Sequence, residues 1–412
     1  MPHYLTAAEA AATLGVSVPT LYSYVSRGML RSAPHTAGKR RLYAADEVRR
    51  LARRKADGKR AGKVAQKVLD WGVPVLESKI TLIADGRLVY RGRDAIELAR
   101  TATLEETAAL LWECDHTCFE ETPDVPLTRA TWHAWLRQTG ASAPHERALV
   151  MLPIAAAHLP RLFAWDTQAQ LRQTAAMLLR VLAAALIERE PAREPLHRQL
   201  AAAWGVRDHL HVELLRAALV VCADHELNAS TFTVRCIAST GMHLFGAVTG
   251  GLAALAGPRH CGETMLVTAL FREASAAGDL DRYVTERLAH SETQQRTVLP
   301  GFGHMLYPTG DPRGALLLEL LTQSATTCAE RQTLAEIDAL VRTAHAATGL
   351  APTVDFALSA IERVLALPQG AAFSLFALGR AAGWIAHAME QYDDGRLIRP
   401  RARYVGPDER AA

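Results

Sequence analysis

The sequence predicts a mainly helical protein, in which a large all-α part follows a small, basic winged helix-turn-helix domain. Three observations support this fold class. Apolar residues recur at helical spacing in most segments after residue 100, only one pair of strands is evident, and the charge is divided unevenly along the chain. A length of 412 residues, with 49% hydrophobic and 22% charged residues, fits two or three globular domains and excludes a disordered chain.

The charge separates a basic N-terminal part from an acidic remainder. Residues 1–70 contain 14 Lys/Arg and 5 Asp/Glu, a net charge of +9, whereas the rest of the chain carries −6. Residues 56–67 are polar, basic and interrupted by glycine, which is typical of a linker. We therefore predict two parts with different partners, with the boundary near residue 68.

Residues 1–55 predict a helix-turn-helix followed by a basic wing. Thr6 and Glu9 form a capping-box pattern for a first helix, and Leu21 and Val25 have the spacing of core residues in a second helix. The pattern resembles winged helix-turn-helix domains of the MerR and excisionase type, whose second helix enters the major groove of DNA. The candidate DNA-binding residues are Thr20, Ser23 and Arg27 in the second helix and Lys39, Arg40 and Arg41 in the wing. A module that only packs or dimerises is the alternative.

The elements of the larger part follow in order. Segments 80–84 and 88–90 flank Asp85-Gly86, a strong two-residue turn signal, and predict a β-hairpin. Helical spacing then predicts helices at 103–114, 148–157, 167–190, 208–222, 230–255, 262–277, 314–343, 353–366 and 371–391.

Several patterns are absent from the sequence. No run of about 18 uncharged apolar residues is present and the start lacks a secretion signal, so we expect a soluble, cytoplasmic protein that does not enter a membrane. The six cysteines are expected to be reduced thiols. Cys114 and Cys118 lack a second ligand pair at suitable spacing, so we predict no metal site.

The predicted helix 371–391 carries an arginine among apolar residues. Phe373, Phe376, Trp384 and His387 share one helical face with Arg380. A buried arginine needs an anion. That anion could be a ligand or an internal Asp or Glu, and the residues alone leave both open.

Polar residues also stand at the ends of other predicted helices. His225 lies in the polar run 223–230 before an apolar helix, where it is either a ligand or a structural histidine. His260 precedes a helix whose dipole should keep the imidazole neutral, and His304 lies in a glycine-bearing turn. Asp355 lies in the first turn of a helix, where the dipole should keep it ionised; it is either a base or an ordinary helix-stabilising residue.

Six segments in this order resemble the citrate synthase family from about residue 71 to residue 406. They are ITLIADGRLVYRGRDAIELA (80–99), DHELNAST (224–231), GPRH (257–260), LPGFGH with DPR (299–304 and 311–313), APTVD (351–355), and GRAAGWIAHAMEQ with GRLIRPRARYVG (379–391 and 395–406). The resemblance implies a large helical domain at 68–261 with 366–412 and a small one at 262–365.

The resemblance also implies a reaction, the condensation of acetyl-CoA with oxaloacetate to citrate and CoA. Asp355 matches the base, His260 the hydrogen-bond donor to the thioester oxygen, and His304 the general acid, while acetyl-CoA is a co-substrate and no permanent cofactor is implied. The substrate-binding and supporting positions are His225, Arg313, Arg380, Phe376, Asn228, Ser230, and Arg399 from the neighbouring subunit of a homodimer.

Two departures from the family pattern leave other functions open. Cys261 stands where the family usually has glycine, and the stretch between His304 and Arg313 lacks the cations that help to bind CoA phosphates. One alternative is a DNA-binding regulator that uses the synthase-like domain as a metabolite sensor. Another is a 2-methylcitrate synthase that uses propionyl-CoA.

Overall fold

The computed structural model divides into two compact units, residues 1–77 and 78–412. The structure describes residues 4–14, 16, 18, 21, 25, 30, 32–34, 41–45, 47–48, 76–122, 124–141, 143–159, 167–257, 260, 263–294, 299–402, 404 and 406. Of these, the side chains of residues 4, 32–34, 41 and 290–294 are not described.

The first unit contains the predicted first helix and a small sheet. Helix α1 (Ala7–Leu14) begins at the predicted capping box, where the Thr6 amide donates to the Glu9 carboxylate (2.8 Å) and the Glu9 amide donates to the Thr6 hydroxyl (3.4 Å). Leu21 and Val25 pack on the same cluster as α1, which confirms them as core residues. The antiparallel sheet has the order β1-β3-β2, with strands β1 (Tyr4–Leu5), β2 (Ser32–Pro34) and β3 (Arg41–Ala44).

The predicted DNA contacts fall mostly outside the described residues. Those outside are Thr20, Ser23, Arg27, Lys39 and Arg40, together with the linker 56–67. Arg41 begins β3, but its side chain is not described. These contacts therefore stay predictions, as do the domain boundaries within the second unit.

The second unit begins with the predicted hairpin, which is confirmed. Asp85 and Gly86 have φ angles of 52° and 73°, the left-handed conformation that a two-residue hairpin turn requires. The strands are β4 (Thr81–Ala84), β5 (Arg87–Tyr90) and the short edge strand β6 (Arg93–Asp94).

The rest of the second unit is helical, which confirms the fold class. Its helices are α4 (Ala95–Thr101), α5 (Leu104–Leu111), α6 (Thr117–Glu121), α7 (Arg129–Thr139), α8 (Pro144–His158), α9 (Gln168–Ile187), α10 (Leu196–Trp204), α11 (His209–Val221), α12 (Ala229–Ala238), α13 (Leu244–Leu255), α14 (Glu263–Ala276), α15 (Leu280–Gln294), α16 (Pro312–Ser324), α17 (Cys328–Thr348), α18 (Val354–Val364) and α19 (Ala371–Asp394). Helices α4, α6, α7, α10 and α15 are additions to the prediction. The first two are only 7 and 5 residues long, too short to give a clear helical period.

Two long predicted helices are wrong, because each is divided in two. The segment 230–255 breaks after α12, where Gly241 adopts a φ of 83° and the His243 side chain caps α13. The segment 314–343 breaks after α16, where Thr327 and Glu330 form a capping box that begins α17.

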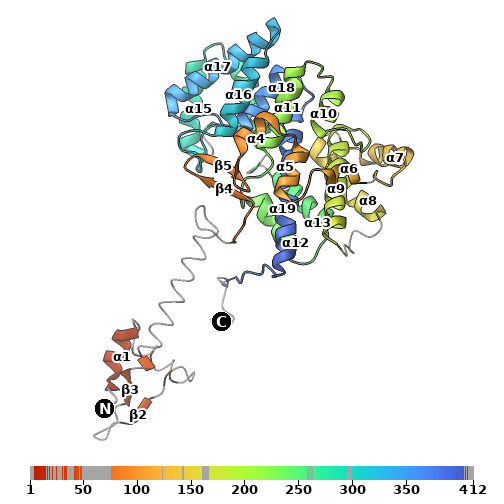
Figure 1. The fold of residues 1–412 in the computed structure, drawn as a ribbon. Coiled ribbons are helices and arrows are strands. Elements are labelled where there is room, and N and C mark those ends of the chain that lie inside the picture. The colour runs from red at the N-terminus through yellow and green to blue at the C-terminus, as the bar shows by residue number, and fades with distance from the viewer. Residues whose placement is uncertain are drawn as a thin grey trace. The chain divides into compact units, whose positions relative to one another are not determined.

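Helix α19 is the central element of the second unit (Figure 1). It packs against α5, α8, α9, α11, α12, α13 and α18. Two glycines allow this packing. A Cβ atom on Gly379 would lie 2.6 Å from the Leu219 carbonyl oxygen, and one on Gly383 would lie 2.4 Å from the Ala223 carbonyl oxygen. The chain at the end of α11 therefore lies directly on α19.

Helix α9 belongs to this core. Within the described part of the chain it is long and apolar enough to cross a membrane by length and composition, but 72% of its most apolar window is buried inside the protein. A core helix of a soluble protein passes the same test.

Candidate active site

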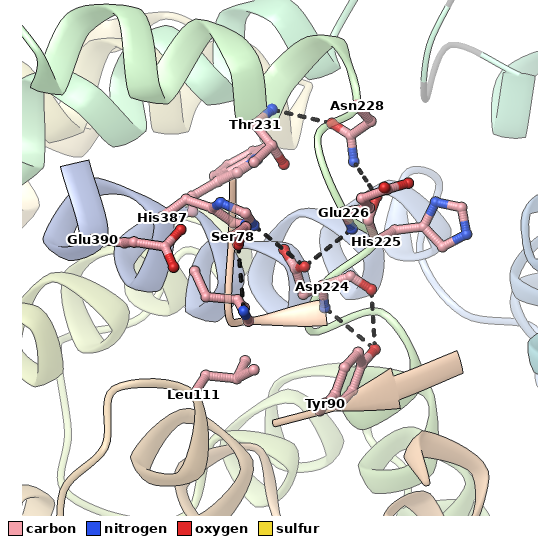
Figure 2. Close-up of polar contacts among 12 residues, drawn as sticks. Ser78, Tyr90, Leu111, Asp224, His225, Glu226, Asn228, Thr231, His387 and Glu390 are labelled. Atoms are coloured by element: carbon pink, nitrogen blue, oxygen red, sulfur yellow. Dashed lines mark hydrogen bonds and ion pairs between the residues drawn. The ribbon is translucent and has the colours of Figure 1, made fainter. Parts of the chain in front are cut away.

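The polar run 223–230 forms a loop that is held from two sides. The hydroxyl of Tyr90, from the hairpin, accepts a hydrogen bond from the Asp224 amide (3.2 Å). The Asp224 carboxylate lies 3.4 Å from Nε2 of His387 in α19. Figure 2 shows Asp224 directed toward His387, with the His225 ring pointing to the opposite side. The loop therefore fixes the direction of His225.

His225 meets His304 in a cluster of rings. The two ring centroids are 5.2 Å apart, and the Tyr307 hydroxyl lies 3.1 Å from Nε2 of His225. Tyr307 also lies beside His304, with ring centroids 5.0 Å apart. Two histidines that are distant in the sequence thus share one site.

Both imidazoles are neutral at pH 7. Burial, followed by the charge of Arg313, lowers the pKa of His304 to about 4 and that of His225 well below its usual value. The Leu306 amide donates to Nδ1 of His304 (3.2 Å), so Nδ1 carries no hydrogen and Nε2 does. His304 is therefore a neutral hydrogen-bond donor at Nε2.

Arg313 is part of a buried ion pair. Its Nε and Nη2 donate to the two carboxylate oxygens of Asp311 (2.9 and 2.8 Å). Asp311 also accepts a hydrogen bond from the Val354 amide (3.0 Å), at the first residue of α18. One carboxylate therefore joins the arginine to the helix that carries Asp355.

Backbone hydrogen bonds bring the His304 turn to the same helix. The Gly303 amide donates to the Ala351 carbonyl (2.9 Å), and the Thr353 amide donates to the Gly301 carbonyl (2.8 Å). Segments 301–303 and 351–353 thus pair side by side. The pairing is antiparallel, so His304 and Asp355 follow it at opposite ends, and Asp355 approaches the site through the charges of Arg313 and Arg380.

Asp355 differs from the expectation in its ionisation. Burial, followed by the nearby charge of Glu263, raises the pKa of the Asp355 carboxyl to about 7. The dipole of α18 was expected to keep this carboxyl ionised, whereas burial shifts its pKa in the opposite direction.

Arg380 is buried without an internal carboxylate partner among the described residues. It is 1% exposed, and its Nε donates to the Cys222 carbonyl (2.9 Å). Its guanidinium carbon lies 4.9 Å from the centre of the Phe376 ring. Within the described residues, its Nη2 is buried and has no hydrogen-bond partner. Of the two anions that the sequence left open, this geometry favours a ligand.

His260 contacts a hydrogen-bonded group of residues from α12 and the loop before it. Its Nε2 lies 2.9 Å from the Ser230 hydroxyl, which lies 2.7 Å from the side-chain oxygen of Asn228. Burial, followed by the charge of Arg380, lowers the pKa of His260 to about 4. The imidazole is neutral, as expected, although burial rather than the helix dipole is the main cause.

Comparison with known proteins decides the family. A family model described as "Citrate synthase, C-terminal domain" matches residues 68–401, and one described as "Helix-turn-helix domain" matches residues 4–56. The chain belongs to the citrate synthase family. It is therefore a citrate synthase-type enzyme that carries an additional helix-turn-helix segment.

Individual relatives agree with this assignment. Citrate synthase from Haloferax volcanii is 33% identical over 367 residues, which cover 81% of this chain and 94% of the relative. Citrate synthase 2 from Bacillus subtilis is 28% identical over 361 residues, 82% of this chain and 95% of the relative. Citrate synthase from Thermoplasma acidophilum, solved as a ternary complex with carboxymethyl coenzyme A and oxaloacetate, shares the fold with a TM-score of 0.70 and 24% identity, covering 84% of this chain and 97% of that chain.

In this citrate synthase-family chain, the predicted site residues fall into three groups. The structure brings together those from the buried loops and helices, which are His225, Asn228, Ser230, His260, His304, Arg313, Phe376 and Arg380. Asp355 joins them through α18. Arg399 is exposed in an irregular segment and makes no hydrogen bond or ion pair to the described site residues. Cys261 lies outside the described residues.

The sequence reasoning assigned no role in the site to four of its residues. Asp311 lies in the DPR segment, and Tyr307 lies in the stretch between His304 and Arg313. Asp224 and Trp384 lie in matched segments, but they gain their contacts only through folding. For the pair Cys114 and Cys118, the sulfur atoms lie 3.6 Å apart, and the described residues contain no group of three possible metal ligands.

Proposed function

We propose that this chain condenses acetyl-CoA with oxaloacetate and hydrolyses the resulting thioester, releasing citrate and CoA. The observation that carries this proposal is Arg380, a buried guanidinium with an unpaired Nη2 whose charge acts on the neutral imidazoles of His225 and His260. Such a site suits a small keto acid: the guanidinium can pair with its carboxylate, and the imidazoles can donate hydrogen bonds to its ketone oxygen. Membership of the citrate synthase family supports the same reaction.

Asp355 is the proposed base that removes a proton from the acetyl methyl group. A carboxyl with a pKa of about 7 is a stronger base than an ordinary aspartate once it is ionised. It remains too weak to form a free enolate, so the thioester oxygen must be stabilised as charge develops on it. His260 supplies that hydrogen bond from Nδ1 when its Nε2 accepts one from Ser230.

His304 is the proposed donor to the ketone of oxaloacetate. Its Nε2 carries the hydrogen, because Nδ1 accepts from the Leu306 amide. The Nε2 hydrogen is placed to stabilise the alkoxide that forms with the new carbon–carbon bond and then to protonate it. His225, Arg313 and Arg380 would bind the substrate carboxylates, Phe376 would line the reaction centre, and Arg399 would come from a second subunit.

The experiment is a thiol-release assay on the purified full chain. Acetyl-CoA and oxaloacetate should release CoA thiol, and Asp355→Asn should lose this activity. Asp338→Asn is a matched control, because Asp338 is exposed on α17, and it should keep the activity. No release by the wild type above Asp355→Asn refutes the proposal. Propionyl-CoA in a parallel reaction decides the acyl preference.

We also propose that the first unit binds duplex DNA. The helix-turn-helix match at residues 4–56 and the net charge of +9 over residues 1–70 favour this second function. Lys39, Arg40 and Arg41 would contact phosphates, and Thr20, Ser23 and Arg27 would face bases. A cytoplasmic location, predicted from the sequence, is compatible with both functions.

The DNA proposal is tested by fluorescence anisotropy with the full chain and a labelled duplex at low salt. Replacing Lys39, Arg40 and Arg41 by alanine should weaken binding and reduce its salt dependence by about one unit of log–log slope for each lost phosphate contact. Replacing Arg53, Arg54 and Lys55 by alanine removes the same charge outside the wing. Equal losses in both variants would argue against a wing contact, and no binding by the wild type would refute DNA binding.

A further inference from the structure

Trp384 makes a buried hydrogen bond to the residue that contacts His260. Its indole Nε1 donates to the Ser230 hydroxyl oxygen at 3.2 Å, and both residues are 0% exposed. Helix α13 packs directly on the indole, since a Cβ atom on Gly251 would lie 3.1 Å from the ring. The indole N–H is therefore held in place behind Ser230.

The hydrogen-bond partners of Ser230 leave few arrangements for its single hydrogen. An indole N–H can only donate, so Trp384 occupies one lone pair of the serine oxygen. The side-chain oxygen of Asn228 can only accept, and its identity as oxygen is fixed by the Thr231 amide, which donates to it (3.0 Å). The serine hydrogen thus points either to Asn228 or to Nε2 of His260.

These two arrangements give His260 different tautomers. If Ser230 donates to Asn228, His260 holds its hydrogen on Nε2, and Nδ1 cannot donate. If Ser230 donates to Nε2, the hydrogen of the neutral imidazole is on Nδ1. Only the second tautomer can donate a hydrogen bond from Nδ1 to a thioester oxygen.

We propose that Trp384 is a positioning residue that favours this second tautomer as charge develops on the substrate. In the chain Trp384 to Ser230 to His260 to substrate, every hydrogen bond points in the same direction. The indole N–H uses one lone pair of the Ser230 oxygen, which makes that oxygen a poorer acceptor for a second hydrogen bond from Nε2–H of His260 and makes its hydroxyl a better donor to Nε2. The inference rests on the proposed function, because it concerns the thioester-binding tautomer of His260.

The test compares two variants, each of which removes one buried hydrogen bond that an indole N–H donates. Trp384→Phe removes the bond to Ser230. Trp112→Phe is the control, since Trp112 Nε1 donates to the Ala382 carbonyl of α19 at 2.9 Å and has no contact with Ser230. We expect both variants to lower Tm by similar amounts. Only Trp384→Phe should lower kcat, by about tenfold, with KM for oxaloacetate unchanged.

A double-mutant cycle separates positioning from general damage. In a Ser230→Ala background, Trp384→Phe should have no further effect on kcat, because the N–H has lost its partner. An equal loss of kcat with and without Ser230, or an unchanged kcat in Trp384→Phe, overturns the proposal.

A spectroscopic measurement keeps the inference separate from the activity. The ring ¹⁵N shifts of His260 report which nitrogen carries the hydrogen, and they should change in Trp384→Phe but not in Trp112→Phe. Unchanged shifts in Trp384→Phe contradict the inference. An inactive wild type whose His260 shifts still respond to Trp384→Phe would refute the proposed function and leave the positioning role supported.

Discussion

At the scale of single residues, the site combines uncharged imidazoles with a weakly acidic carboxyl. His225, His260 and His304 are neutral at pH 7 because partial or full burial, together with a nearby arginine charge, lowers the pKa of each imidazole. Burial also raises the pKa of the Asp355 carboxyl, to about 7. The neutral imidazoles can therefore act as hydrogen-bond donors at the same pH at which the Asp355 carboxylate can act as a base.

The pH dependence of activity follows from Asp355. The base form exists only above its pKa, so kcat/KM for acetyl-CoA should fall as the pH drops below about 7 and reach a plateau above it. His260 and His304, with pKa values of about 4, stay neutral across this range. A pH–rate profile from pH 5 to 9 provides the measurement. A midpoint near 4, the value of an ordinary aspartate, contradicts the prediction.

Arg380 should determine the affinity for oxaloacetate. Arg380→Gln removes the unpaired guanidinium, and KM for oxaloacetate should rise by roughly 100-fold, since a charge-assisted pair is lost. Arg380→Lys keeps the charge but loses the bidentate N–H donors, so its KM should lie between the values of the wild type and of Arg380→Gln. Steady-state kinetics with varied oxaloacetate measures both. An unchanged KM in Arg380→Gln would show that the anion is not the substrate.

At the scale of elements, the site depends on a loop that lies on a helix without an intervening side chain. The Gly383 amide donates to the Ala223 carbonyl at 2.9 Å, which leaves no room for a Cβ atom between α19 and the loop. Asp224 and His225 follow directly. The direction of the His225 ring is therefore set by the absence of a side chain on α19.

Gly383→Ala should displace this loop. The new methyl group would lie 2.3 Å from the Asp224 carboxylate, which should cost about 1–3 kcal/mol of folding stability and most of the activity. Gly246→Ala in α13 is the control, because the three atoms nearest to its methyl would all belong to the flexible Met242 side chain. Urea unfolding and thiol release measure the two effects. Similar behaviour of both variants would contradict the argument.

Sequence reasoning reached elements with strong local signals and missed those that depend on distant partners. The hairpin, α1 and α19 follow from a turn dipeptide, a capping box and a long apolar run. The break between α16 and α17 also has a local signal, the Thr327 and Glu330 capping box, which the apolar periodicity obscures.

The raised pKa of Asp355, unlike these elements, has no local signal in the sequence. It depends on burial and on Glu263, which no spacing in the chain encodes. The same holds for the Asp311 bond to α18 and the Trp384 bond to Ser230, because both join segments that are far apart in the sequence.

At the scale of the whole molecule, the site predicted from family resemblance spans two subunits. Arg399 is exposed on its own chain, at the end that follows α19. If it serves the site of a second copy, two inactive variants should complement each other. An Asp355→Asn subunit paired with an Arg399→Gln subunit contains one site with both native residues.

Mixing and re-associating these two variants should restore about a quarter of the wild-type activity, because half of the dimers are mixed and each has one complete site. Each variant alone should stay nearly inactive. Thiol release before and after subunit exchange gives the measurement. If activity does not recover although mass spectrometry verifies the exchange, Arg399 does not serve the site of a second subunit.

The carboxylate of Asp311 has a further consequence. It already neutralises Arg313, so of the two arginines buried at the site only Arg380 offers uncompensated positive charge. The Arg380 guanidinium of one chain therefore balances only half of the charge of a dianionic substrate. If Arg399 of a second copy supplies the other half, dilution that separates the copies should weaken the binding of dicarboxylates well before the chain unfolds.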